Sequence, residues 1–234
     1  MRTLGILGGM SWESTAHLYG LLNQDVAARL GGLHSADLLL RSVDFAEIEE
    51  LQRAGDWAAA ARLLGEAGAG LKAGGAQGLL IATNTMHKVA EEVERLSALP
   101  LIHIVDVTAA ALKAAGITRA GLLATRYTME QDFYRGRMSD KHGIELLTPT
   151  SSARAEVHRI IYEELCRGRI LDSSRDFFRQ AVRDLATGQG AQAVILGCTE
   201  ICQLLDPADP ASPVPLFDGT ALHARAAVDW MLSC

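Results

Sequence analysis

The 234-residue sequence has little of what defines several common protein classes. It has no excess of basic residues, because 22 Lys and Arg stand against 28 Asp and Glu and give a formal net charge of −6. A nucleic-acid footprint needs clustered basic side chains. No apolar run reaches the ~20 residues of a membrane span, and the N-terminus lacks a signal peptide's long apolar stretch and cleavage site. We expect no nucleic-acid partner, no membrane partner and a cytoplasmic location.

Cysteine and proline are also scarce. The four cysteines, Cys166, Cys198, Cys202 and Cys234, are too few for a disulfide framework in a chain of this length, so reduced thiols are expected. Six prolines occur, three of them within residues 207–213, and no low-complexity linker divides the chain. Hydrophobic residues make up 49% and charged residues 21%, which provides for a large core and excludes a disordered chain.

Short apolar runs alternate with longer amphipathic segments, the pattern of parallel strands joined by crossover helices in α/β proteins. The predicted strands are Thr3–Leu7, Asp37–Val43, Gly78–Ala82, Leu101–Ile104, Ala120–Ala124, Glu145–Leu147, Ala193–Gly197 and Pro215–Phe217. The clearest predicted helices are Trp57–Ala73, His87–Ser97, Ala155–Cys166 and Ser174–Thr187.

An internal repeat indicates how these elements are grouped. The segment Gly75–Thr83 aligns with Gly190–Cys198 at an offset of 115 positions, and Asp106-Val-Thr-Ala aligns with Asp218-Gly-Thr-Ala. We therefore predict two pseudo-symmetric α/β lobes, each a four-stranded parallel sheet flanked by helices, with the active site in the interlobe cleft. Residues 1–105 with 219–234 would form the first lobe, and residues 106–218 the second.

Thr83 and Cys198 occupy equivalent positions in the repeat, at the carboxyl ends of equivalent strands, where ligands bind in open parallel sheets. Cys198 precedes Thr199-Glu200, a predicted helix start whose positive partial charge would lower the thiol pKa. The alternative is that Cys198 is a small, inert cysteine of the core.

Cys202 lies one helical turn after Cys198, which raises the question of a metal site. No other Cys or His stands at a customary zinc spacing from either residue, so no metal is expected.

Polar residues follow other predicted strands as well. Asn84 and Thr85 offer an amide and a hydroxyl at a helix start, which suits a carboxylate ligand. His87, one turn further, could relay protons or be a hydrogen-bonded structural residue. The glycines before Met10-Ser11 lack the G-x-G-x-x-G spacing and a Walker lysine, which argues against a nucleotide.

In the second lobe, Thr125-Arg-Tyr-Thr128 corresponds to the turn that contains Met10-Ser11 in the first lobe. It offers hydroxyls and a guanidinium that could bind a ligand, although Ser and Thr at such turns often serve only as caps.

The segments that carry these residues resemble the aspartate/glutamate racemase family of cofactor-independent racemases, over essentially the whole chain. They are Gly8–Glu13, Thr83–His87, Gly121–Thr125, Gly197–Glu200 and Asp218–His223. The resemblance implies two α/β lobes, an interlobe site and no cofactor, neither pyridoxal phosphate nor a metal. It also implies α-proton chemistry, in which two cysteines flank the substrate α-carbon, one removing the proton and the other returning one to the opposite face.

The sequence departs from that pattern at the first cysteine, which is replaced by Thr83, whereas Cys198 matches the second. The segment Ile161-Tyr-Glu-Glu164 also lacks the lysine that some members carry. We therefore expect an aspartate/glutamate racemase, or an enzyme that exchanges the α-proton. Its predicted catalytic residues are Cys198 and Thr83, its predicted substrate-binding residues are Met10, Ser11, Gln52, Asn84, Thr85, Thr125, Thr128, Thr199 and Glu200, and His87 supports them.

Two alternatives remain open from the residues alone. One is a single-cysteine decarboxylase of malonate-type acids, and the other is a non-catalytic small-acid binding protein. The substrate side chain is not determined, although Arg41 and Arg126 could pair with a second carboxylate. The expected partner is a small amino-acid substrate, and a homodimer is expected only as the commonest assembly.

Overall fold

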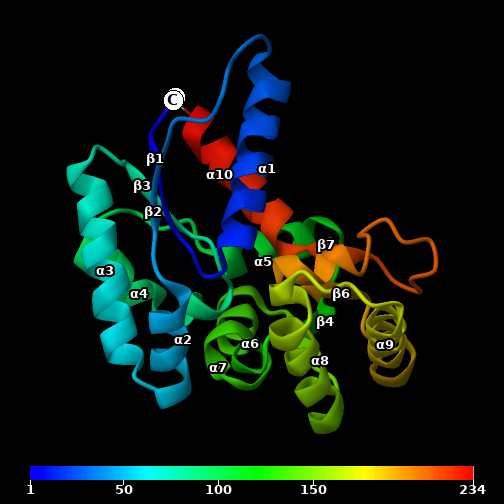
Figure 1. Cartoon of the computed structure of the whole chain (residues 1–234). Coiled ribbons are helices and arrows are strands. Elements are labelled where there is room, and N and C mark those ends of the chain that lie inside the picture. The colour runs from blue at the N-terminus through cyan, green and yellow to red at the C-terminus, as the bar shows by residue number, and fades with distance from the viewer. Residues whose placement is uncertain (234) are drawn as a thin grey trace. The chain divides into compact units, whose positions relative to one another are not determined.

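The computed structural model describes residues 1–233 and folds into two compact units. Among the described residues, the first unit contains Met1–His103 together with residues 223–233, and the second contains Ile104–Leu222. Figure 1 shows the elements of both units along the chain. Each unit has a parallel sheet flanked by helices, as the alternation of short apolar and longer amphipathic segments predicts.

The sheet of the first unit has three strands in the order β2-β1-β3, all parallel. Strand β1 is buried at every residue, which explains its unbroken apolar sequence, since a parallel strand covered on both faces does not alternate. The strands are β1 (Leu4–Gly8), β2 (Leu38–Ser42) and β3 (Gly78–Ile81).

The predicted fourth strand of this sheet, Leu101–Ile104, is wrong. Leu101 forms only an isolated parallel bridge with Leu79, through hydrogen bonds from Leu79 N to Pro100 O and from Ile102 N to Leu79 O, both 2.9 Å. Helix α5 (Ile104–Ala114) begins at Ile104, so the extended segment is too short for a strand.

Helices cover both faces of the first sheet (Figure 1). Residues of α1 and α10, such as Leu22 and Val228, pack with Leu4 and Ile6 on one face. Leu7 belongs to the cluster on the other face, with residues of α3 and α4. The helical segments are α1 (Trp12–Leu30), α2 (Phe45–Ala54), α3 (Trp57–Ala73), η1 (Thr85–Val89), α4 (Ala90–Ser97) and α10 (Gly219–Leu232).

The sheet of the second unit has four parallel strands in the order β5-β4-β6-β7, which confirms the prediction for this unit. The strands are β4 (Arg119–Leu123), β5 (Glu145–Leu147), β6 (Ala193–Leu196) and β7 (Leu216–Asp218). Around them lie α5, α6 (Arg126–Glu130), α7 (Asp132–Gly136), η2 (Arg137–Lys141), α8 (Ser151–Glu163), η3 (Leu165–Arg167), α9 (Asp172–Arg183), η4 (Asp184–Gly188) and η5 (Thr199–Gln203).

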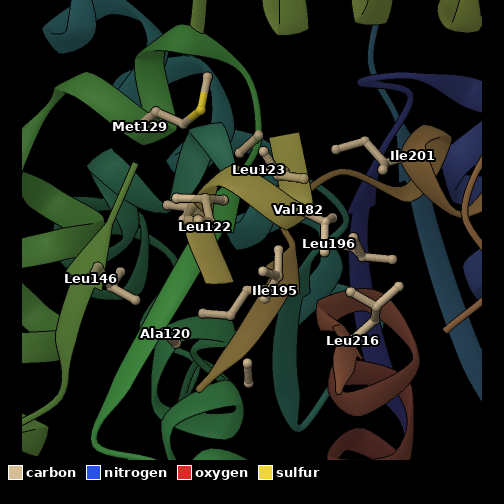
Figure 2. Packing of buried hydrophobic residues seen from close by; sticks show 14 of the residues in the cluster. Ala120, Leu122, Leu123, Met129, Leu146, Val182, Ile195, Leu196, Ile201 and Leu216 are labelled. Atoms are coloured by element: carbon tan, nitrogen blue, oxygen red, sulfur yellow. The ribbon is translucent and has the colours of Figure 1, made fainter. Parts of the chain in front are cut away.

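One hydrophobic cluster joins these elements. Leu122 and Leu123 of β4 and Ile195 and Leu196 of β6 are at most 1% exposed, and Figure 2 shows them packed with residues of α9 and η5. This packing fixes the carboxyl end of β6, from which the chain continues into Cys198.

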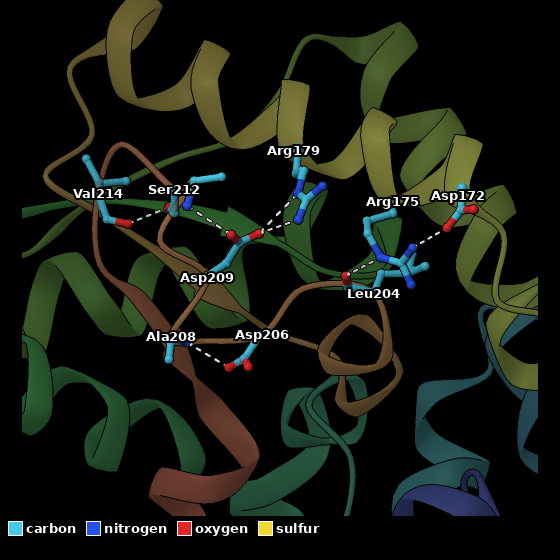
Figure 3. Close-up of polar contacts among 10 residues, drawn as sticks. Asp172, Arg175, Arg179, Leu204, Asp206, Ala208, Asp209, Ser212 and Val214 are labelled. Atoms are coloured by element: carbon cyan, nitrogen blue, oxygen red, sulfur yellow. Dashed lines mark hydrogen bonds and ion pairs between the residues drawn. The ribbon is translucent and has the colours of Figure 1, made fainter.

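The proline-marked loop after η5 is tied to α9 (Figure 3). Arg179 donates from Nε and Nη2 to Asp209 Oδ2 at 3.0 and 2.9 Å, and Arg175 Nε donates to Leu204 O at 3.1 Å. These contacts anchor the chain on the carboxyl side of η5. In residues 1–233 there is no helix with the length and apolar character needed to cross a membrane.

Candidate active site

In the first unit the turn after β1 holds Met10 and Ser11, which are 4% and 6% exposed. Gly9 has a φ of +91°, and a Cβ at this position would lie 2.2 Å from Val43 O, so only glycine fits. Ser11 caps α1 by accepting a hydrogen bond from Ser14 N at 3.3 Å. The turn therefore places both predicted residues at the carboxyl end of β1.

The segment after β3 carries Asn84 and Thr85, which are 7% and 4% exposed. Asn84 Oδ1 is buried and accepts no hydrogen bond from the described residues. A buried polar atom left in this state costs about 1–3 kcal/mol, which a ligand group would recover. Gln52, from α2, lies beside this segment, because its Nε2 donates to Met86 Sδ at 3.1 Å.

His87 holds the backbone of this segment through a hydrogen bond. Its Nδ1 lies 2.8 Å from Thr83 O, and because a carbonyl oxygen only accepts, Nδ1 carries the proton. The ring lies edge-on to those of His103 and His223, with centroids 4.8 and 5.6 Å away.

His223 Nε2 donates in turn to Ile102 O at 2.7 Å, and burial lowers the pKa of His223 to about 4. The sequence gives no indication that His103 belongs to this group, because only the fold brings its ring next to that of His87.

In the second unit Cys198 follows β6, and its thiol meets a carboxylate. Cys198 Sγ donates to Glu200 Oε2 at 2.7 Å, and Thr199 Oγ1 donates to the same oxygen at 2.8 Å. Cys166 Sγ donates to the other oxygen, Oε1, at 3.8 Å. Glu200 is 5% exposed, so three predicted residues, Cys198, Thr199 and Glu200, form one hydrogen-bonded group around a buried carboxylate.

The expected lowering of the Cys198 pKa is wrong. Burial raises the pKa of the Cys198 thiol well above its ordinary value, and the negative charge of Glu200 raises it further. Segment η5 is a five-residue 3-10 helix, and its small dipole does not outweigh these two effects. In this environment the protonated thiol of Cys198 is therefore favoured over the thiolate.

The other described cysteines differ in their neighbours. Cys166 belongs to η3, 32 positions before Cys198 in sequence, so that only the fold shows its contact with Glu200. Burial and the nearby Asp218 raise the pKa of Cys202, which does not share the carboxylate of Glu200 through any described hydrogen bond. Cys234 lies outside the described residues.

The turn after β4 brings Thr125 and Thr128 together, with their hydroxyls 3.3 Å apart. They are 8% and 1% exposed. Arg126 stands between them in sequence, and its guanidinium lies 5.2 Å from the centroid of the Tyr127 ring. Arg126 N donates to His158 Nδ1 at 3.5 Å, and His158 is a neighbour that the sequence did not predict.

Arg41, the other arginine predicted to pair with a second carboxylate, lies in the first unit, in a surface groove beside α3. Among residues 1–233, no group of three or more His, Cys, Asp and Glu side chains is arranged to hold a metal ion.

Residues 7–227 match the model of the family described as Asp/Glu/Hydantoin racemase. The chain belongs to this family. This confirms the resemblance seen in the strand-end motifs. A candidate Asp/Glu racemase from Yersinia pestis is 54% identical and has a TM-score of 0.93, with 100% of both chains covered. An aspartate racemase homologue from Pyrococcus horikoshii OT3 is 28% identical, with a TM-score of 0.84 and 100% of both chains covered.

The fold of the racemase family extends to more distant relatives. The Picrophilus torridus aspartate racemase is 19% identical and has a TM-score of 0.73, with 99% of this chain and 94% of that chain covered. At this identity the similarity shows the shared α/β fold and does not by itself identify a substrate.

Proposed function

We propose that the protein is a racemase of aspartate or glutamate that works without pyridoxal phosphate, by removing and returning the α-proton. The observation that supports this most strongly is the thiol–carboxylate pair of Cys198 and Glu200, 2.7 Å apart at the end of β6 in a chain of the racemase family. A thiol that can lose its proton to a neighbouring base is suited to general acid–base chemistry.

Cys198 must first give up its own proton to act as the base. The Sγ–H proton passes to Glu200 Oε2, and the resulting thiolate removes the α-proton of the substrate. The electron pair of the C–H bond moves into an enolate-type intermediate of the substrate carboxylate. On its own face, Cys198 returns its proton to the α-carbon and then recovers the proton held by Glu200. On the opposite face, water held by the Thr83 hydroxyl gives a proton to the α-carbon, and Glu200 releases its proton to the hydroxide that remains. Both routes end with a Cys198 thiol and a Glu200 carboxylate, so that no external reagent is consumed.

Other polar groups would bind the substrate and its intermediate. Asn84 has a buried amide oxygen with no described donor, and we assign it to a polar group of the substrate. The hydroxyls of Thr85, Thr125 and Thr128 add partners that are already positioned by the fold. Positioned donors stabilise the developing negative charge more strongly than mobile water does.

Thr83 is assigned to the opposite face of the α-carbon from Cys198. Its hydroxyl is a much weaker acid and base than a thiol, and His87 holds its carbonyl group. Met10, Ser11 and Gln52 complete the proposed substrate-binding set in the first unit.

For the side-chain carboxylate of the substrate we assign Arg126, which directly follows the buried Thr125. Arginine suits this role because its planar guanidinium binds a carboxylate through two parallel hydrogen bonds.

Incubation with each enantiomer of aspartate and glutamate in deuterated water tests the function. We expect α-deuterium in the recovered amino acid and slow appearance of the opposite enantiomer. Arylated or alkylated malonates supplied in parallel distinguish the decarboxylase, which would release carbon dioxide and leave the amino acids unlabelled. Binding of either amino acid in calorimetry, without exchange or carbon dioxide release, would identify a binding protein and overturn the proposal.

A further inference from the structure

Segment η3 brings a second thiol to the carboxylate of Glu200. Cys166 Sγ donates to Glu200 Oε1 at 3.8 Å, whereas Cys198 Sγ and Thr199 Oγ1 donate to Glu200 Oε2 at 2.7 and 2.8 Å. Cys166 and Glu200 are 34 positions apart in sequence, so this buried carboxylate is held from two separate segments. The proposed reaction uses Cys198 and Glu200 and leaves Cys166 without a role.

The two residues before Cys166 anchor η3 to the rest of the second unit. The Glu164 carboxylate is 5% exposed and accepts hydrogen bonds from Ser174 Oγ and from Arg159 Nη2, the latter at 2.8 Å. Leu165 is 2% exposed and belongs to the hydrophobic cluster of this unit. The Cys166 thiol is therefore placed by a buried polar contact and by core packing, rather than carried on a mobile surface segment.

The orientation of the Glu200 carboxyl group matters for the proposed proton transfer. Cys198 gives its proton to Oε2, and on its own face it later recovers the proton that Glu200 holds. The last torsion of a glutamate side chain is soft and roughly two-fold, so half a turn would exchange the two oxygens and carry that proton away from Cys198. A donor on Oε1 opposes this rotation, since it holds the second oxygen while Thr199 holds the first. A thiol is a weak donor, but an ionised acceptor strengthens the bond.

We propose that Cys166 is a positioning residue, whose thiol holds Glu200 Oε1 so that Oε2 stays beside Cys198 while the proton moves between them. This inference rests on the proposed function, in which Glu200 takes the Cys198 proton. Cys166 keeps its own proton throughout and acts through Glu200. Burial, then Glu200 and then Cys166 raise the pKa of the Cys198 thiol, which indicates that the two thiols lie within electrostatic range of each other.

Cys202 provides a contrast within the same unit. Like Cys166, it is half-buried and packs against the hydrophobic cluster of the second unit. Its thiol interacts with Asp218, and no hydrogen bond within the described residues joins it to Glu200. Replacement of Cys202 therefore removes a thiol of similar burial without releasing the Glu200 carboxylate.

Exchange of the substrate α-proton in deuterated water measures the effect on the reaction. Cys166→Ala should lower kcat for exchange by about 5- to 20-fold. It should leave KM within about two-fold of the native value, because Cys166 contacts Glu200 rather than the substrate. Cys166→Val fills the space of the thiol without supplying a donor and should behave in the same way. Cys202→Ala should keep the native kcat.

A double-mutant cycle separates the positioning of Glu200 from a general structural role. In Glu200→Gln the side chain can no longer take the Cys198 proton, so adding Cys166→Ala should cause no further loss of rate. A residue that only supported the local fold would lower the rate by the same factor in both backgrounds. That result would overturn the inference, as would a native kcat in both Cys166→Ala and Cys166→Val.

The infrared S–H stretching band of Cys198 tests the geometry without substrate. A hydrogen bond lowers the S–H stretching frequency, and the loss of the band in Cys198→Ala identifies it. In Cys166→Ala the Cys198 band should shift to higher frequency, because Glu200 is no longer held in one orientation, whereas Cys202→Ala should leave the band in place. An unmoved Cys198 band in Cys166→Ala would overturn the inference. A native chain that does not exchange the α-proton would overturn the proposed function, and the infrared band would then decide by itself whether Cys166 positions Glu200.

Discussion

The Cys198 thiol donates a 2.7 Å hydrogen bond to Glu200, two residues later in the same strand-to-helix turn. The two groups share one proton and one negative charge. Burial and the charge of Glu200 both favour the thiol over the thiolate. In the proposed reaction the thiolate therefore forms only as Glu200 takes the proton, and the pair acts as a single acid–base unit.

Cys198→Ala should abolish α-proton exchange and leave the fold intact. The side chain is half-buried at a strand end rather than central to the core, and removing a general acid–base group typically costs at least about 100-fold in rate. Deuterium incorporation measured by NMR gives the rate, and circular dichroism checks the fold. Cys202→Ala is the matched control, since Cys202 is half-buried in the same segment. Retention of more than a tenth of the activity in Cys198→Ala would show that the base is another residue.

Glu200→Gln should lower the exchange rate by about 10- to 100-fold, because an amide cannot accept the thiol proton. The same change should lower the pKa of Cys198, since the neighbouring negative charge that raises it is removed. Thiolate absorbance during a pH titration measures this shift, with Cys198→Ala subtracted as the background. A pKa that stays the same or rises would contradict the coupling between the two groups, whatever happens to the rate.

How much of this site can be predicted from the sequence depends on how far apart along the chain the interacting residues are. Thr83 and Cys198 are identified by a repeat of local segments, and the parallel strands that precede them follow from apolar runs. The sign of the Cys198 pKa shift was predicted incorrectly, because it depends on burial and on the orientation of Glu200. The contact from Cys166 depends on the packing of η3 near η5 and has no local pattern.

The same distinction applies to the fold. The segment Leu101–Ile104 has a strand-like composition, but the start of α5 limits it to one bridge with Leu79. Composition shows that a segment can be extended. The number of residues that pair with a neighbouring strand depends on where the next helix begins.

The buried His223 should make stability depend on pH in mildly acidic solution. Its pKa is lowered from 6.5 to about 4, so between these values the unfolded chain binds a proton that the folded chain does not. The free energy of unfolding should therefore fall as pH decreases from 6.5 to 4, by up to about 1.4 kcal/mol per pH unit from this residue.

Urea unfolding at several pH values measures the slope. His223→Gln should reduce the slope over this range, whereas His34→Gln, at an exposed position, should leave it unchanged. An equal slope in the native chain and in His223→Gln would assign the pH dependence to other groups.

The replacement of a cysteine by Thr83 should separate exchange from inversion. With one thiol, the two faces of the α-carbon are chemically unequal, because Cys198 can remove and return a proton on its own face while the other face has a hydroxyl. The enantiomers have equal free energy in water, so kcat/KM for complete inversion must be the same in both directions. Exchange with retention has no such constraint. We therefore expect one enantiomer to incorporate deuterium much faster than it inverts.

Thr83→Cys tests the origin of that asymmetry. A thiol on the second face should raise the inversion rate toward the exchange rate, because both faces then carry an effective acid and base. NMR of the α-proton and polarimetry on the same sample measure the two rates together. Thr83→Ser, which keeps the hydroxyl and removes only a methyl group, is the matched control and should leave the ratio of the two rates unchanged. Equal exchange and inversion rates in the native protein would show that Thr83, with His87 behind it, already delivers protons efficiently, and the single-thiol explanation would fail.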